Sequence, residues 1–360
     1  MEFEQEQAKV EAIQEEIATL QEEIADLGRL LKEARGKTDL YRQIADVAER
    51  LGDAYAKLRT GLRTSQAQAV PSFVYDQGII VPAYMSPGDT SSWLKIIEAG
   101  IIVEIVVLNY SFIGSDFDPN NRQTHDAYVN ARNLFSMLVA NGHTRLFGYV
   151  CTDGGRNQIT PWTTLKIEQD IGTWYGRYGD HLGGMFLDVG PTLNDTVTCD
   201  GRTATHVGED SQKAFYERLY DYMKITYGSE QNNVLINASH FRNSWVMDYA
   251  DYAVVWEGTY DNYNTSLAPQ GFGTWGVPDW WRLFPPKKIA HVIFNCQGTA
   301  ALDDAVLLSK QRNAGLLYVH DTNDTDTTAD YTRLPTYWQR EVRGVIGPVG
   351  GMHKRIVKDL

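Results

Sequence analysis

The sequence has little cysteine: it contains three, Cys151, Cys199 and Cys296. A small and odd number is a poor basis for a disulfide framework. Cys151 and Cys296 each end an apolar run, where a buried free thiol is the ordinary expectation. We therefore expect the chain to be made and folded in a reducing cytoplasm.

Long apolar runs and positive charge are also scarce. No segment approaches the roughly 20 apolar residues that span a bilayer, and the acidic N-terminus lacks the apolar core of a secretory signal. Lys and Arg number 33 against 46 Asp and Glu, a formal net charge of -13. Nucleic acid and anionic membranes should be repelled. We predict no signal peptide, no membrane insertion, no nucleic-acid partner, and a neutral or cationic partner.

Several chemical motifs are missing. No Gly-x-Gly-x-x-Gly follows the first apolar run, and neither a Gly-x-Ser-x-Gly elbow nor a phosphate-cradling loop is present. The eight histidines show no paired spacing and there is no Cys-x-x-Cys. The acidic run 321–330 lacks the Gly and terminal Glu of a calcium loop. We therefore expect no cofactor and no metal.

Residues 1–62 carry a clean apolar stripe. Val10, Ile17, Ile24 and Leu31 occupy one heptad position, and a second amphipathic run follows the break at 36–39. An oligomeric coiled coil and an intramolecular helical hairpin both fit this pattern. Nothing in the sequence indicates that the stripe packs on the rest of the chain, which favours a homo-oligomer, either a dimer or a trimer.

The polar composition of residues 63–77 predicts a linker, and residues 349–360 are predicted to form a C-terminal tail. Between them, over 78–348, short apolar runs alternate with amphipathic ones. The pattern predicts strands at 79–84, 101–108, 145–151, 183–188, 233–237, 252–257, 289–295 and 315–320, and helices at 91–99, 124–141, 163–178, 209–227, 300–313 and 335–346. Eight strands alternating with helices predict an α/β fold of the (β/α)8 TIM-like barrel type. A doubly wound open sheet is the alternative.

Every predicted strand ends in a hydrogen-bonding residue, at the rim where such barrels place their chemistry. Two of these residues are acids, Asp188 and Glu257, and a pair of carboxylates facing one cleft is the minimum for cleaving a glycosidic bond. For either acid taken alone, a helix cap or a surface acid in a loop is the commoner role. The other candidates, expected to bind substrate, are Tyr84, Asn109, Tyr149, Asp153, Asn237, Trp256, Tyr260, Asn295, His320 and Asp321.

Aromatic residues are dense between 256 and 281, where Trp256, Tyr260, Tyr263, Trp275, Trp280 and Trp281 occur. Flat rings stack on the apolar faces of sugars, so an aromatic cleft with acids and amides suits a carbohydrate. The alternative is that Trp280 and Trp281 cap the outer layer of the barrel.

Six short segments, in order, resemble the spherulin-4-like family. They are Ile80–Pro87, Phe147–Arg156, Gly184–Asp188, Val234–Asn237, Val254–Tyr260 and Leu334–Trp338, and together they span 78–346. The resemblance implies a (β/α)8 glycoside hydrolase of the endo-α-1,4-galactosaminidase type. In that family the fourth strand ends in Asp-Glu and a further Glu ends the sixth, so Asp188 and Glu257 match, while Val189 replaces the intervening Glu.

The resemblance and the residues together predict hydrolysis or binding of a cell-surface polysaccharide, with Asp188 as nucleophile or ion-pair stabiliser and Glu257 as general acid. Trp256 and the charge of Asp188 are expected to raise the pKa of Glu257. Loss of the Glu at 189 leaves open a non-catalytic glycan-binding module or a structural assembly protein. The acidic stalk further favours a bacteriophage tail component acting at a host cell surface on a polysaccharide containing amino sugars.

Overall fold

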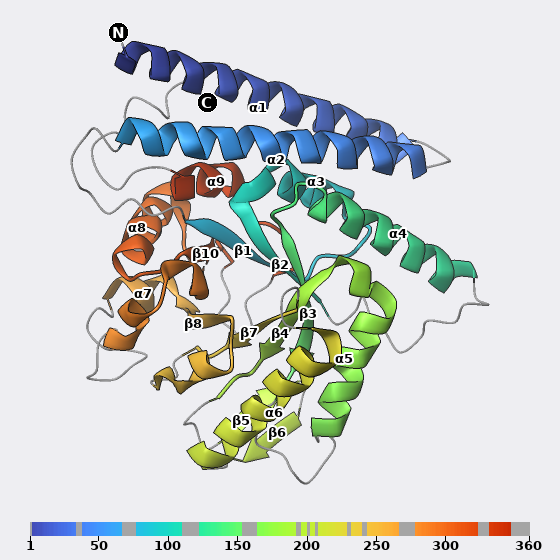
Figure 1. Cartoon of the computed structure of the whole chain (residues 1–360), viewed down its shortest axis with the longest axis vertical. Coiled ribbons are helices and arrows are strands. Elements are labelled where there is room, and N and C mark those ends of the chain that lie inside the picture. The colour runs from blue at the N-terminus through green and yellow to red at the C-terminus, as the bar shows by residue number, and fades with distance from the viewer. Residues whose placement is uncertain are drawn as a thin grey trace.

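Eight short apolar segments form the parallel strands of a closed barrel in the computed structural model (Figure 1). The structure describes residues 2–33, 38–66, 77–109, 122–152, 164–191, 196–199, 202–205, 208–228, 232–239, 243–265, 278–322 and 331–346. The barrel strands are β1 (Gly78–Ala83), β2 (Val103–Leu108), β3 (Arg145–Cys151), β4 (Leu182–Asp188), β7 (Asn233–Asn237), β8 (Tyr252–Thr259), β9 (Ile289–Phe294) and β10 (Leu316–Val319).

The sheet closes because β1 pairs in parallel with β2 on one side and with β10 on the other. The strand order is β1-β10-β9-β8-β7-β4-β3-β2. Each strand lies within a residue or two of its predicted range, so the predicted (β/α)8 barrel is confirmed and the open-sheet alternative is excluded. Strands buried on both faces read as continuous apolar runs, and β1 is buried along its whole length.

Helices cover the barrel at most crossovers. They are α3 (Thr90–Glu98), α4 (Arg122–Val139), α5 (Thr164–Tyr178), α6 (Glu209–Tyr227), α7 (Tyr260–Thr265), α8 (Gly298–Gln311) and α9 (Trp338–Ile346). Between β7 and β8 the described chain forms only a 3-10 turn, Ser244–Asp248. A small antiparallel hairpin, β5 (Thr196–Cys199) with β6 (Arg202–Thr205), lies between β4 and α6. Its polar, Thr-rich strands carry no apolar pattern, so sequence reasoning missed it.

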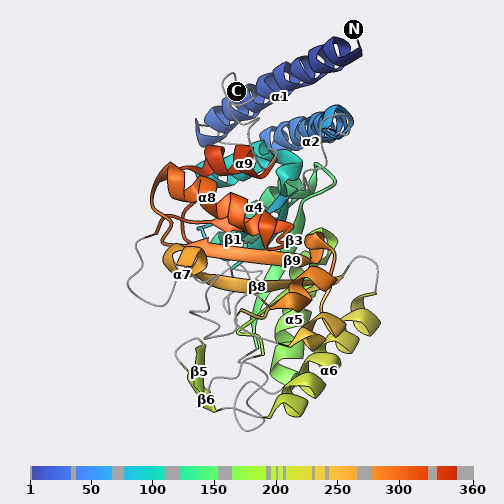
Figure 2. The same ribbon diagram turned by 90° about the vertical axis from the view of Figure 1, so that its left-hand side faces the viewer.

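Two long helices, α1 (Glu2–Glu33) and α2 (Thr38–Gln66), lie side by side across the outside of the barrel (Figures 1 and 2). They run antiparallel, since Glu23 pairs with Arg50 at 3.2 Å and Glu16 with Lys57 at 3.6 Å. The apolar stripes are buried, with Ile17, Leu20, Ile24, Leu31, Ile44 and Leu51 all less than 5 % exposed. Residues 38–66 form one helix, so the predicted linker at 63–77 begins inside α2.

The hairpin of α1 and α2 is seated on α3 and α4. A Cβ added at Gly28 would come within 2.3 Å of Leu94 on α3, and one at Gly52 within 2.8 Å of the Cβ and carbonyl oxygen of Asn141, just after α4. Gln21 Nε2 donates to the carbonyl oxygen of Glu98 at 3.0 Å. The expectation that nothing in the chain covers the stripe is therefore wrong, because helices α3 and α4 of the barrel present a matching surface.

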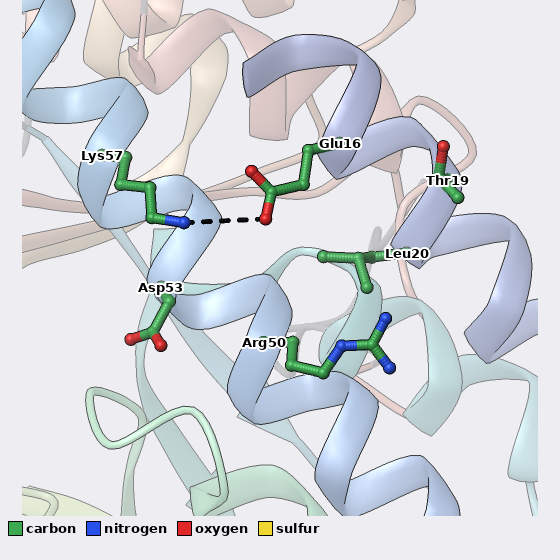
Figure 3. Close-up of a pocket in the computed structure, with 6 residues that line it drawn as sticks. All are labelled: Glu16, Thr19, Leu20, Arg50, Asp53 and Lys57. Atoms are coloured by element: carbon green, nitrogen blue, oxygen red, sulfur yellow. Dashed lines mark ion pairs between the residues drawn. The ribbon is translucent and has the colours of Figure 1, made fainter. Parts of the chain in front are cut away.

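Figure 3 shows a surface pocket of about 290 Å³ between the two helices. Its lining residues are Glu16, Thr19, Leu20, Arg50, Asp53 and Lys57. Glu16 and Lys57 form an ion pair across the pocket, whereas Arg50 pairs with Glu23, which does not line it, and these side chains are about half exposed. This pocket belongs to the hairpin alone and takes no residue from the barrel.

Candidate active site

A single amide joins the two predicted catalytic acids. Asn237, the last residue of β7, donates from Nδ2 to Asp188 Oδ1 at 2.8 Å and to Glu257 Oε2 at 2.6 Å. The two acceptor oxygens are therefore no farther apart than the sum of these distances. That limit lies within the about 5–5.5 Å typical of retaining glycosidases and below the about 6.5–9.5 Å of inverting ones.

Two tyrosines also donate to the acids. Tyr149 on β3 donates its hydroxyl to Asp188 Oδ2 at 2.8 Å, and Tyr331, which precedes α9, donates to Glu257 Oε1 at 2.8 Å. Each of the four carboxylate oxygens thus accepts at least one hydrogen bond. Asp188 and Glu257 are nonetheless half-buried rather than fully buried, so both retain access from outside.

The turn after β4 holds Asp188 in place. The carbonyl oxygen of Asp188 accepts from the backbone N and the Oγ1 of Thr152, at 2.9 and 2.8 Å. Val189 then adopts a φ of 49°, a conformation that a β-branched residue takes only under strain. At Gly190, whose N donates to the Asn237 carbonyl at 2.9 Å, a Cβ would come within 2.0 Å of that oxygen. The turn needs a glycine at 190 and strains the residue at 189.

A serine performs the same task for Glu257. Ser239 Oγ accepts from the backbone N of Glu257 at 2.8 Å and donates to its carbonyl oxygen at 3.1 Å. Ser239 N in turn donates to Asn237 Oδ1 at 3.2 Å. The backbone of the acid and the bridging amide are thereby tied to one another.

Burial and the nearby charge of Asp188 raise the pKa of Glu257, and the hydrogen bonds from Tyr331 and Asn237 partly oppose that rise. The same buried, negatively charged surroundings raise the pKa of Tyr84 well above its usual value. A carboxylic acid that keeps its proton beside a second acid is suited to general acid catalysis.

Three tyrosine rings lie around the acids in the described part of the chain. Tyr84 packs edge-on against Tyr149 with ring centres 5.8 Å apart, and against Tyr331 at 5.6 Å. Its backbone N also donates to the Tyr331 carbonyl oxygen at 3.1 Å. The structure thus brings Tyr84, Tyr149 and Asn237 together with the two acids, as the sequence predicts.

Two other predicted residues, His320 and Asp321, hold the segment that carries Tyr331. His320 is fully buried and its Nε2 lies 3.0 Å from the carbonyl oxygen of Arg333. Asp321 accepts from Arg333 Nη1 at 2.8 Å and from the backbone N of Thr336 at 3.2 Å. These hydrogen bonds lower the pKa of Asp321, against the raising effect of burial. Both side chains therefore stabilise the segment that carries Tyr331.

The remaining predicted residues follow other strands of the barrel or lie outside the described chain. Asn109 and Asn295 follow β2 and β9 at the same rim, and Asn295 has a φ of 53°. Tyr260 turns to α8, where it donates to Asp304 at 3.0 Å. Asp153 lies outside the described residues.

The aromatic residues from 256 to 281 lie mainly in the outer layer of the barrel. Trp256 is 2 % exposed and packs on Tyr263 of α7 with ring centres 5.4 Å apart, and Tyr263 lies 2.7 Å from His291 through its hydroxyl. Trp281 packs on the other side of His291 at 4.8 Å. This arrangement matches the alternative weighed for Trp280 and Trp281. The pKa of Glu257 is raised by burial and by the charge of Asp188. Trp275 lies outside the described residues.

Sequence reasoning missed Tyr331 as a site residue. It follows the acidic run 321–330 and belongs to no strand, so the search of strand ends could not reach it. The only available signal was its position three residues before the family-like segment Leu334–Trp338. Ser239 was missed for a similar reason, since it lies two residues past the end of β7.

The cysteines differ from expectation at one position. Cys151, paired in register with Asp188, is disulfide-bonded, so the prediction of a free thiol there is wrong. The error arose because the spacing of cysteines in a sequence does not show which strand end meets which loop. Cys296 is a buried free thiol, as predicted, and burial raises its pKa to about 12.

In the described part of the chain, no group of three or more His, Cys, Asp or Glu side chains is placed to hold a metal ion. Within the same residues, no helix combines the length and apolarity needed to cross a membrane.

Comparisons with known proteins agree with this fold. The model of the spherulation-specific family 4 (Spherulin4) matches residues 78–345, the whole barrel. A similar solved structure is the crystal structure of Aspergillus clavatus Sph3 in complex with GalNAc, with a TM-score of 0.55 and 19 % identity. The match covers 76 % of this chain and 99 % of that chain. No curated protein matches the chain.

Proposed function

The chain belongs to the spherulation-specific family 4, and on this premise we propose that its barrel binds and hydrolyses a polysaccharide containing amino sugars. The observation that carries the proposal is the pair of acids bridged by Asn237, with Glu257 in surroundings that favour its protonated form. The GalNAc held by the similar Sph3 structure supports an amino sugar as the substrate unit. A polymer with free amines would also suit the net charge of -13.

The bridged geometry favours a retaining mechanism. Glu257 donates its proton to the glycosidic oxygen while Asp188 attacks the anomeric carbon, so the sugar–oxygen bond breaks and a glycosyl ester forms on Asp188. Glu257, now a carboxylate, then takes a proton from water as that water attacks the same carbon and releases Asp188. Tyr149 and Asn237 keep Asp188 oriented through both steps.

The test is hydrolysis of a panel of polysaccharides and oligosaccharides that contain GalNAc or galactosamine, followed by analysis of the released sugars. We expect release by the full-length chain, and a loss of at least about a hundredfold in Asp188→Asn and in Glu257→Gln. Arg340→Gln, a change on α9 at an exposed ion pair with Asp303, serves as the matched control and should leave release unchanged. Release that persists in both acid variants would contradict the proposed mechanism.

A second candidate is a module that binds the glycan without cleaving it. The observation in its favour is Val189, which lies next to Asp188 where the family resemblance expects a Glu, and which adopts a strained φ of 49°. Binding of GalNAc oligosaccharides measured by calorimetry, with no product over long incubation and no effect of Glu257→Gln on the affinity, would favour this candidate.

Display on an oligomeric stalk in a bacteriophage tail remains a proposal, supported by the acidic composition of residues 1–35. Light scattering of the full-length chain measures the oligomeric state. A monomeric mass at micromolar concentration would remove the support for a stalk.

A further inference from the structure

The hydroxyl of Tyr331 differs in kind from the other donor to Glu257. A hydroxyl can donate one hydrogen bond and also accept, whereas the Nδ2 group of Asn237 can only donate. Asn237 uses Nδ2 for both Asp188 Oδ1 and Glu257 Oε2. A proton on Glu257 Oε2 would therefore face the N–H of Asn237, donor against donor. A proton on Oε1 would face the Tyr331 oxygen, which can accept it.

We propose that Tyr331 is a positioning residue that holds the acid proton of Glu257 on Oε1 and reverses its hydrogen bond when that proton leaves. With Glu257 neutral, its Oε1–H donates to the Tyr331 oxygen. When the proton passes to the leaving group, that O–H bond breaks and a new one forms on the leaving oxygen. The Tyr331 hydroxyl then rotates to donate to the carboxylate and keeps its own proton throughout.

The segment around Tyr331 is built to hold this hydroxyl still. The side chain is 6 % exposed, and its ring packs edge-on against Tyr84 and against His320, with ring centres 5.6 and 6.1 Å away. The Tyr331 carbonyl accepts from Tyr84 N, and His320 binds the carbonyl of Arg333. A tyrosine that merely filled space would need none of these backbone ties.

The charged and titratable groups that face Glu257 include Asp188 from β4, Tyr84 just after β1 and Tyr331 itself, while Asn237 and Ser239 are neutral. Asp188 favours the protonated form of Glu257, and the Tyr331 and Asn237 bonds favour the charged form. Because the Tyr331 hydroxyl donates to Glu257 while Tyr149 donates to Asp188, removing the Tyr331 hydroxyl takes a direct donor from Glu257 and leaves the Tyr149 bond to Asp188 in place.

The experiment is a pH titration of the Glu257 carboxyl by carbon-13 NMR in the full-length chain labelled at glutamate, with Glu257→Gln used to assign the signal. In Tyr331→Phe the charged carboxylate loses a donor and the neutral acid loses an acceptor. The bond to the charged form is the stronger of the two, so we expect the pKa of Glu257 to rise by about one unit. Tyr149→Phe removes the equivalent hydroxyl from Asp188 and leaves both bonds to Glu257, so the Glu257 pKa should stay in place. Circular dichroism checks that both variants are folded.

A second measurement retains a tyrosine-like side chain at position 331. A fluorinated tyrosine introduced at position 331 is a stronger hydrogen-bond donor, so it should shift the pKa of Glu257 downward, opposite to Tyr331→Phe. Equal shifts in the two phenylalanine variants, or no shift with either change at 331, would overturn the proposal.

The proposal rests on the proposed function only in treating Glu257 as the acid. Since the titration needs no substrate, the two can fail separately. The predicted shifts without any hydrolysis of the glycan panel would contradict the proposed function and leave the role of Tyr331 standing. Hydrolysis without the shifts would do the reverse.

Discussion

The helical hairpin and the acid-bearing rim of the barrel use charge in opposite ways. On the hairpin, Arg50 and Lys57 make ion pairs between half-exposed side chains, and an apolar stripe beneath them holds the helices together. At the rim, Asp188 and Glu257 are half-buried and every carboxylate oxygen has at least one donor. Water screens exposed ion pairs, so the loss of one partner costs little stability. Partly buried acids depend on their individual hydrogen-bond donors. The hairpin is therefore stabilised by its buried apolar surface, and the rim by the positions of individual hydrogen-bond donors.

The largest change expected on the hairpin side is Ile24→Ala. Ile24 lies on α1 and is fully buried, so the change removes apolar contacts and leaves a cavity. We expect the free energy of unfolding to fall by about 2–5 kcal/mol, measured by urea denaturation of the full-length chain. Leu30→Ala, at a side chain that is 53 % exposed on the same helix, is the control and should change it by less than about 0.5 kcal/mol. Equal effects would show that the stripe is not buried in solution.

A smaller effect is expected from Gly52→Ala, which tests whether the hairpin is seated on the barrel. The new Cβ would come within 2.8 Å of the Asn141 Cβ and carbonyl oxygen, which must move apart at a cost of about 1–3 kcal/mol. Thermal unfolding by calorimetry measures the loss.

Gly176→Ala on α5 is the matched control for this change. Its Cβ would meet nothing within 4 Å, so the substitution should stabilise the chain by about 0.4–1 kcal/mol through lower entropy of the unfolded state. Stabilisation by both substitutions would mean that the hairpin does not contact the barrel at Gly52.

The smallest effect is expected from Arg50→Ala. Its guanidinium lies 3.2 Å from Glu23 and 3.7 Å from Asp46, and the Arg50 side chain is 51 % exposed. We expect a loss of about 0.2–1 kcal/mol at low salt, and less at high salt because the pair is screened. Denaturation midpoints at two salt concentrations check this. A loss as large as that of Ile24→Ala would remove the distinction between the hairpin and the rim.

These cases show how far pattern reasoning extends. The strands were predictable because parallel strands buried on both faces read as apolar runs that end in polar residues, and Asp188, Asn237 and Glu257 all lie at such ends. Tyr331 was not predictable in this way, because it reaches Glu257 from a connection 74 residues further along the chain. Trp256 was misleading for the opposite reason: it is adjacent to Glu257 in sequence, but its ring packs outward on α7.

The sequence by itself determined the barrel, the two long helices and the two acids, since each depends on local periodicity or on position at a strand end. Only the tertiary structure decided what covers the helices, which rings surround the acids and which group bridges them. Those features depend on contacts between segments far apart in the chain, such as Gly52 with Asn141 and Tyr331 with Glu257. The periodicity of the sequence does not predict such contacts, because they arise only when the barrel closes and brings its strand ends to one rim.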